Sequence, residues 1–140
     1  MRRRFTFDDS DNGCFGCSPT NRRGLGIEVS ATDDGVEIEY VASEELCGAR
    51  GIVHGGIQAT LLDEVMCVTA LAKLGHTVVT GELTIRYLAP VPTGTPILGR
   101  GRIRELRGRS AFIDGTLWLA GDEQERTRAQ GRFFRHDDEG

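Results

Sequence analysis

The sequence predicts an α+β fold in which one long central helix is wrapped by a curved antiparallel β-sheet. Residues 56–74 carry apolar side chains at helical spacing and on most faces, as expected of a helix that is buried on most sides. Short apolar or alternating runs lie before and after this helix, and glycine and proline separate them. A single helix covered by one antiparallel sheet satisfies this order of elements.

The predicted elements follow in chain order. Two strands are expected at residues 24–30 and 36–41, and Asp33-Asp34-Gly35 between them is a hairpin turn signal. A glycine-rich connection over 44–56 leads to the helix, which Gly75-His76 ends. The remaining strands are expected at residues 78–88, 97–106, 110–119 and 126–134.

Length and composition are those of an ordinary globular protein. The 140 residues suit one domain, so we expect a single domain over 1–140 with an irregular segment over 1–23. A net charge of −4 argues against nucleic acid or a membrane surface as a general partner. No apolar run is long enough for a membrane helix, and the start of the chain does not resemble a secretory signal. We therefore expect a cytoplasmic protein.

The most informative stretch joins a pair of glycines to a helix that carries two acids. His54-Gly55-Gly56 leads into the helix, and Asp63 and Glu64 lie in its apolar middle. Free N–H groups at a helix start suit an oxygen with developing negative charge, as in an oxyanion hole for acyl transfer. A partly desolvated Asp63 could act as nucleophile or general base. The alternatives are that Asp63 caps a loop or pairs with an arginine, and that His54 is only a structural histidine.

The two acids point in different directions from the predicted helix. Gly56, Thr60, Asp63 and Cys67 follow one another at helical spacing and share a narrow stripe. Glu64 lies about 100° away from Asp63 around the helix. We interpret Glu64 as one half of an ion pair on the helix surface.

Taken together, these motifs resemble a known family. The chain has His54-Gly55-Gly56, then six intervening residues, then the Asp63-Glu64 pair, and later the strand from Val79 to Pro92. These motifs are similar to those of the hot-dog-fold acyl-CoA thioesterases. The branch that they resemble is the PaaI-like and 4-hydroxybenzoyl-CoA thioesterase branch. The opening Cys14-Phe-Gly-Cys17 is similar to an N-terminal signature of one subgroup, and the similarity extends to about Phe134.

The resemblance implies an enzyme that hydrolyses an acyl-CoA thioester to a free acid and CoA without a metal or organic cofactor. Asp63, nine residues after the motif histidine, would be the general base or nucleophile. The Gly55 N–H would polarise the thioester carbonyl, His54 would hold the helix start in shape, and Thr80 would orient water. The residues that we assign to substrate binding are Gly48, Gly56, Thr60, Leu62, Arg86 and Leu88.

Two patterns concern the strands after the helix. Simple alternation places Thr80, Glu82, Thr84 and Arg86 on one face, and Leu83, Ile85 and Tyr87 on the other. Residues 86–109 carry six arginines against one acid, and arginine suits the phosphates of CoA. The same alternation is typical of a solvated strand face, which we favour for most of them, with one or two at the nucleotide phosphates.

The resemblance also implies a homodimer, which could pair again into a tetramer. The site would lie at the subunit interface, with Asp63 of one chain facing the Gly55 region of the other. Gly48 departs from the family, because related enzymes often place Asn or Gln six residues before the motif histidine. Gly48 favours the alternative of a non-catalytic acyl-CoA-binding protein, whereas Asp63 favours an enzyme. We do not find the Asp/His constellation of a hydratase, and an assembly module would leave the acidic stripe unexplained.

The cysteines offer a further alternative, a metal or redox site. Cys14 and Cys17 form a Cys-x-x-Cys motif, but a structural zinc site needs about four ligands, and the other cysteines and histidines are scattered. We therefore expect no metal. We interpret Cys14 and Cys17 as reduced, buried residues of a turn.

Overall fold

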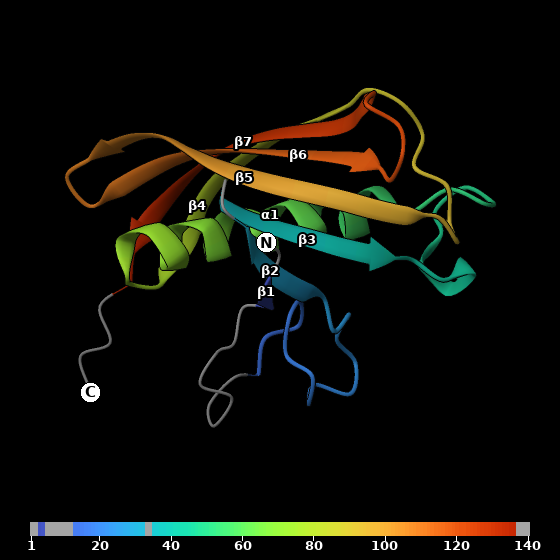
Figure 1. Cartoon of the computed structure of the whole chain (residues 1–140), viewed down its shortest axis with the longest axis horizontal. Coiled ribbons are helices and arrows are strands. Elements are labelled where there is room, and N and C mark those ends of the chain that lie inside the picture. Colours follow the sequence, from blue (N-terminus) through green and yellow to red (C-terminus); the bar gives the residue numbers. More distant parts are fainter. Residues whose placement is uncertain (1–2, 5–12, 33–34, 137–140) are drawn as a thin grey trace.

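A computed structural model of the protein describes residues 3–4, 13–32 and 35–136 (Figure 1). These residues form a long α-helix, a short 3-10 helix and a set of strands. The elements are β1 (Arg3–Arg4), β2 (Glu28–Thr32), β3 (Gly35–Val41), η2 (Glu44–Leu46), α1 (Gly55–Leu74), β4 (Val78–Tyr87), β5 (Pro96–Arg107), β6 (Ser110–Leu119) and β7 (Glu125–Arg135). Neither helix of the described residues combines the length and the apolar character needed to cross a bilayer.

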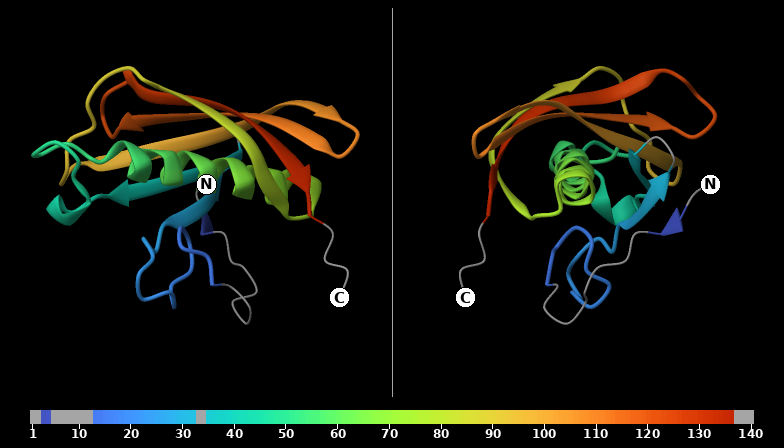
Figure 2. Two further views of the ribbon diagram at one scale, coloured as in Figure 1. Left: turned by 180° about the vertical axis from the view of Figure 1, so that it is seen from behind. Right: turned by 60° about the vertical axis from the view of Figure 1, so that its left-hand side comes forward.

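The strands form one antiparallel sheet in the order β1-β2-β3-β5-β6-β7-β4. The right-hand view of Figure 2 looks nearly along α1 and shows the sheet arching around it. The concave face of the sheet packs on α1, and the core residues Leu62, Val65, Met66, Ile113 and Phe133 are fully buried there. The predicted fold, a long helix wrapped by a curved antiparallel sheet, is confirmed.

Glycines in the strands allow α1 to lie close to the sheet. A side chain at Gly101 would collide with the Thr69 hydroxyl, and a Cβ atom at Gly115 would lie 2.8 Å from the Met66 sulfur. A glycine in a strand often marks such a close approach. The abundance of glycine in the sequence therefore has a packing origin as well as a turn-forming one.

Two predictions about the N-terminal third need correction. The first strand of the core begins at Glu28 and not at residue 24, because Gly26 has a left-handed φ of 61° that interrupts an extended backbone. The segment predicted to be irregular contributes the short strand β1, which pairs with β2. Of the predicted hairpin turn, Asp33 and Asp34 lie outside the described residues, while β2 and β3 pair antiparallel as expected.

Strand β4 contains a bulge that moves Thr80 to the face opposite the predicted one. Thr80 is opposite Phe133 and Leu83 is opposite Gly131, so the register shifts at Gly81. The extra residue reverses the two-residue alternation, and Thr80 therefore faces α1 together with Leu83, Ile85 and Tyr87. The prediction that Thr80 shares a face with Glu82, Thr84 and Arg86 is wrong. Gly81 permits the bulge, since a Cβ atom there would collide with the Phe134 ring.

The outer edge of β4 lies open at one end of the sheet. Within the described chain β4 pairs only with β7. Val79 and Tyr87 on β4, and Leu88 just beyond it, are 48%, 53% and 48% exposed. A long open edge with exposed apolar side chains is a surface on which another chain can pair.

Candidate functional site

The start of α1 is shaped by His54. The Gly56 N–H donates to His54 Nδ1 at 2.9 Å, so the histidine caps the helix and carries its ring proton on Nε2. The His54 N–H in turn donates to the Leu46 carbonyl at 2.9 Å. Within the described part of the chain, the Gly55 N–H has no acceptor. One backbone donor at the positive end of the helix dipole therefore remains for a ligand oxygen.

Side chains from two strands hold this helix start in place. The Tyr87 hydroxyl donates to the Gly55 carbonyl at 2.8 Å. Gln58, which is buried, donates to the Val53 carbonyl at 3.0 Å and accepts from the Thr127 hydroxyl at 2.5 Å. Sequence reasoning missed the roles of Tyr87 and Gln58 because both depend on contacts between distant segments. The sequence held one sign of these roles, which was Tyr87 near the end of the strand that follows the helix.

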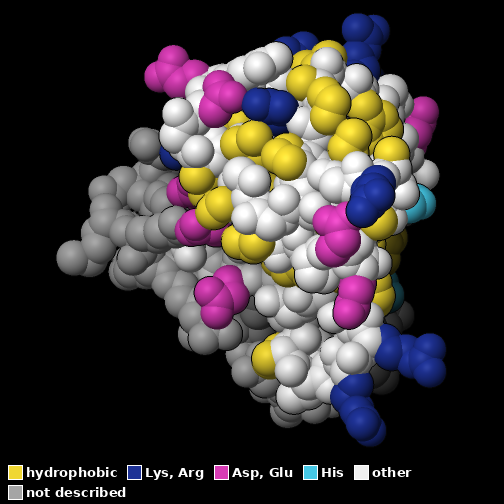
Figure 3. Space-filling model, turned by 90° about the vertical axis from the view of Figure 1, so that its right-hand side faces the viewer, with side chains coloured by type: hydrophobic (Ala, Val, Ile, Leu, Met, Phe, Trp, Pro, Cys, Tyr) yellow, Lys and Arg dark blue, Asp and Glu magenta, His cyan; other side chains and the backbone are white. Residues whose placement is uncertain are grey.

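A hollow of about 400 Å³ lies beside the helix start, and we name it the helix-start hollow. Gly48, His54, Gly55, Tyr87 and Leu88 are among the residues that line it. Figure 3 looks onto the end of the molecule where α1 begins and shows hydrophobic side chains gathered there. A Cβ atom at Gly48 would lie 3.3 Å from His54 Cα, which leaves little room for a larger side chain.

Asp63 lies farther along α1 and is held by β4. The Thr80 hydroxyl donates to Asp63 Oδ1 at 2.6 Å, whereas Asp63 Oδ2 makes no hydrogen bond within the described residues. Burial raises the pKa of Asp63, and the Thr80 hydrogen bond lowers it in part. Burial and the neighbouring Asp63 charge raise the pKa of Cys67 to about 12, so this thiol is protonated at neutral pH. Asp63 is therefore partly desolvated and keeps one oxygen that no described residue binds.

Asp63 lines a second hollow of about 430 Å³, which we name the carboxylate hollow. Thr60, Asp63 and Glu64 from the helix and Thr80 and Leu83 from the strand contribute to its lining. The N-terminal segment closes one wall with Cys14, Phe15 and Gly16.

The two hollows are separate within one chain. Gly55 and Asp63 are eight residues apart on α1, which corresponds to roughly 12 Å along the helix axis. A single thioester carbonyl cannot contact the Gly55 N–H and the Asp63 carboxylate of the same chain at once.

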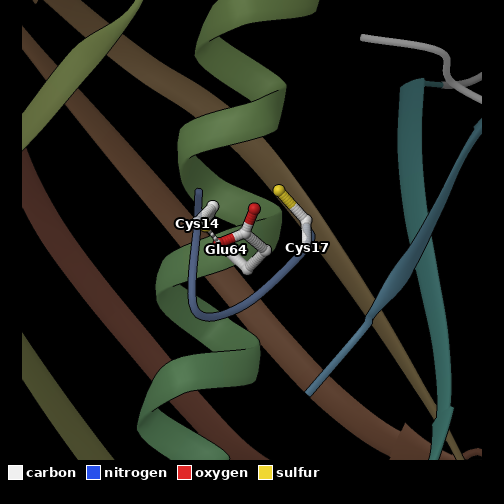
Figure 4. A group of neighbouring side chains, drawn as sticks. All are labelled: Cys14, Cys17 and Glu64. Atoms are coloured by element: carbon white, nitrogen blue, oxygen red, sulfur yellow. Dashed lines mark hydrogen bonds between the residues drawn. The ribbon is translucent and has the colours of Figure 1, made fainter. Parts of the chain in front are cut away.

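Glu64 is buried and forms no ion pair within the described part of the chain, so the prediction of an ion pair on the helix surface is wrong. The side chain is only 9% exposed and lies under the Cys14–Cys17 turn, as Figure 4 shows. The Cys14 thiol donates to Glu64 Oε2 at 3.4 Å. Burial and the Glu64 carboxylate raise the pKa of Cys17, so its thiol is protonated at neutral pH in this arrangement. The two cysteines are half-buried residues of a turn and are not in disulfides.

Comparison with known proteins identifies the family. The sequence pattern of the thioesterase superfamily matches residues 50–125, which is more than half of the chain and includes His54, Gly55 and Asp63. The chain belongs to the thioesterase superfamily. The resemblance to hot-dog thioesterases is therefore confirmed.

Individual relatives of this thioesterase-superfamily chain are similar to it in sequence or in fold. The acyl-coenzyme A thioesterase THEM4 of Mus musculus is 28% identical over 120 residues, covering 83% of this chain and 51% of the mouse protein. The chain thus spans about half the length of that relative. The crystal structure of the BH2602 protein from Bacillus halodurans with CoA has a TM-score of 0.72 and 28% identity, covering 81% of this chain and 76% of that one. The E. coli PaaI protein is 20% identical with a TM-score of 0.71, covering 79% and 84%, and shows the fold alone.

Of the other residues predicted to bind substrate in this superfamily member, two line the hollows and two do not. Thr60 lines the carboxylate hollow and donates to the Gly56 carbonyl at 3.0 Å. Leu88 lines the helix-start hollow. Leu62 is fully buried against the sheet and lines neither hollow. Arg86 points to the outer side of the sheet, away from α1.

The arginines after the helix mostly occupy the outer surface of the sheet. Arg100, Arg104 and Arg107 pair with acids at 4.0, 3.4 and 2.7 Å, which agrees with a solvated strand face. A larger hollow of about 660 Å³ includes Arg100 and Arg102 in its lining, but neither the helix start nor Asp63. We therefore place the candidate site at the two hollows along α1.

Proposed function

We propose that the protein is an acyl-CoA thioesterase whose active site is completed by a second copy of the chain. The observation that carries the proposal is the Asp63 carboxylate, which lines a hollow beside an open strand edge. Thr80 holds one of its oxygens, and the other makes no hydrogen bond to any residue that the structure describes. The Gly55 N–H at the helix start, which has no acceptor within the described residues, supplies the second group that the chemistry needs. Relatives named acyl-CoA thioesterases and a CoA-bound structure of the same fold support this assignment.

The chemistry needs one base and one donor. Asp63 removes a proton from a water that attacks the thioester carbonyl carbon, or its free oxygen attacks that carbon itself. The Gly55 N–H donates to the carbonyl oxygen as negative charge develops there. The carbon–sulfur bond then breaks, and CoA leaves as a thiolate that takes up a proton. In the route where Asp63 attacks directly, the acyl group is left as a mixed anhydride on Asp63, and water then hydrolyses it to release the free acid. Thr80 keeps the carboxylate oriented during these steps.

The open edge of β4 suggests how the second copy binds. Two β4 strands can pair antiparallel about a two-fold axis between Leu83 and Thr84, which places Thr80 opposite the partner subunit's Tyr87. Thr80 holds Asp63, and Tyr87 holds Gly55. This pairing would bring Asp63 of one chain to the helix start of the other, and so join a carboxylate hollow to a helix-start hollow.

The second candidate is a non-catalytic acyl-CoA-binding protein on the same fold. Gly48 favours it, because this position lines the helix-start hollow without a side chain that could hold water or the carbonyl.

Release of CoA separates the two candidates. A thiol reagent would report CoA from a panel of short-chain, medium-chain and aromatic acyl-CoAs, for the native protein and for Asp63→Asn. We expect turnover of the native protein and a loss in the variant that falls on kcat much more than on KM. Binding of acyl-CoA without turnover of any of them would overturn the enzyme assignment and support the binding protein.

A mixing experiment tests the shared site. Gly55→Pro removes the N–H but keeps the helix start, since proline suits the first helical position and His54 already has φ −55° and ψ 137°. Mixed dimers of Gly55→Pro and Asp63→Asn chains contain one intact site, so random mixing should recover about a quarter of the native activity. Each variant alone should be nearly inactive.

The matched control is Gly55→Ala, which keeps the N–H and adds a Cβ atom 3.3 Å from the Tyr87 hydroxyl oxygen. It should retain far more activity than Gly55→Pro. If mixing recovers no activity although the chains form dimers, the site lies within one chain.

A further inference from the structure

The Cys14–Cys17 turn packs directly on α1 and is fixed by its backbone. Ser18 N–H donates to the Cys14 carbonyl at 3.1 Å, which closes the turn. The Phe15 and Gly16 carbonyls accept from backbone N–H groups of residues 25 and 27, both at 2.8 Å. A Cβ atom at Gly16 would lie only 2.5 Å from Glu64 Oε2, so the turn sits tightly over the carboxylate.

This turn brings two sulfur atoms to one carboxylate. The sulfurs of Cys14 and Cys17 and a carboxylate oxygen of Glu64 all lie within 4.8 Å of one another. Figure 4 shows the Glu64 carboxylate between the two cysteines. Ligand atoms on a tetrahedral zinc ion, with bonds of about 2.3 Å to sulfur and about 2.1 Å to oxygen, are roughly 3.6–3.8 Å apart. The three ligand atoms would need to approach one another by at most about 1.2 Å to reach this geometry.

A cation beside Glu64 would balance the negative charge of its buried carboxylate. The carboxylate is buried, and no Lys or Arg of the described residues forms an ion pair with it. A buried carboxylate is costly without a positive partner, and thiols are only weak hydrogen-bond donors.

We propose that Cys14, Cys17 and Glu64 bind a zinc ion. Each thiol gives up its proton to solvent, and one Zn²⁺ replaces the two protons, so the net charge of the cluster is unchanged. Three protein ligands leave the fourth tetrahedral position for water. Sequence reasoning expected no metal because it counted two cysteines, and the third ligand comes from a residue 47 positions farther along the chain.

The zinc ion would join the N-terminal segment to α1 beside the carboxylate hollow. Cys14, Phe15 and Gly16 form part of the wall of that hollow, so the ion would fix the wall next to Asp63. The proposal does not depend on the thioesterase assignment, because its test measures the metal and not the reaction.

The test uses the full chain, reduced and freed of metal, titrated with Zn²⁺ against a chromophoric chelator. We expect one zinc ion per chain. Cys14→Ser, Cys17→Ser and Glu64→Gln should each weaken binding by about 100-fold or more, since even outer partners of ligands contribute 10–100-fold. The matched control is Cys47→Ser, another half-buried cysteine outside the cluster, and it should bind zinc like the native protein.

Cobalt gives a readout that does not depend on how the variants fold. Co²⁺ added to the native protein should produce a thiolate-to-metal charge-transfer band in the near ultraviolet. Absence of zinc binding or of this band under reducing conditions would overturn the proposal. Equal weakening by Cys47→Ser and Cys14→Ser would do the same, as would zinc binding that Glu64→Gln leaves intact.

Discussion

Two neighbouring acids of α1, Asp63 and Glu64, occupy opposite kinds of environment. Asp63 faces β4 at the open edge of the sheet, where the Thr80 hydroxyl holds one oxygen and no described residue binds the other. Glu64 faces the N-terminal segment and is enclosed by the Cys14–Cys17 turn. Both lie in the apolar middle of the same helix, and their side chains leave it about 100° apart around the helix axis.

The difference shows that the packing partner decides what a helix acid can do. A carboxylate beside a hollow and a hydroxyl keeps an oxygen available for chemistry. The Glu64 carboxylate lies under a tight turn, where the Cys14 thiol donates to it. The residue type alone does not distinguish these two environments. Substitutions of the two acids, or of the β4 residues that support Asp63, can therefore test the difference.

The largest expected effect distinguishes the two acids by turnover. Asp63→Asn keeps the shape of the side chain but removes the base, so kcat should fall by about 100-fold to 10,000-fold. Glu64→Gln should lower kcat by less than about tenfold, because the Thr80 hydroxyl orients Asp63 and not Glu64, which lies under the Cys14–Cys17 turn. Steady-state kinetics on the preferred acyl-CoA would check this. Equal losses in the two variants would remove the distinction.

A stability measurement examines the bulge that turns Thr80 toward Asp63. Gly81→Ala places a methyl group against the Phe134 ring, so the free energy of unfolding should fall by about 1–3 kcal/mol. The control is Gly13→Ala, where an added Cβ atom has no neighbour within 4 Å. Denaturant unfolding of both variants would measure the difference. The same stability for both would mean that the bulge tolerates a side chain.

The pH dependence of activity tests the hydrogen bond on the Asp63 side. Thr80→Val removes the hydroxyl that lowers the pKa of Asp63, so this pKa should rise further above its usual range. The base is active when ionised, and the acidic limb of kcat/KM should therefore move to higher pH. Thr80→Ser retains the hydroxyl and should keep the native limb. A limb that stays in place in Thr80→Val would exclude Thr80 as the positioning residue of Asp63.

The smallest expected effect is a change in the melting temperature when the Asp63 carboxylate is removed. Folding raises the pKa of Asp63 above its unfolded value, which is near 3.8. The protonated carboxyl therefore contributes to stability below pH 3.8, and this contribution is lost as the pH rises through the pKa of the folded state. At pH 7 the ionised group is unfavourable, and Asp63→Asn should melt at the same temperature as the native protein or slightly above it. That advantage should shrink as the pH falls toward 4. Thermal melts at several pH values would show it, and a destabilised variant at pH 7 would contradict it.

Periodicity and local signals were sufficient to predict the order of the elements, the bounds of α1 to within a residue and the acid stripe with Asp63. They were not sufficient where the structure departs from a regular period. The bulge at Gly81 reversed the face of Thr80, and no local signal distinguishes that glycine from those that pack against α1. The contact of Glu64 with Cys14 joins segments 50 residues apart, and so does not appear in any local pattern.

The bulge at Gly81 also has an evolutionary consequence. Deleting that one residue would make β4 regular and rotate Thr80 to the outer surface, while every residue of the motif would remain in the chain. A relative shortened by one glycine would thus keep its histidine, aspartate and threonine in an alignment and still lack the hydroxyl beside the acid. In such a lineage, activity would be lost through the length of a strand and not through the identity of a residue.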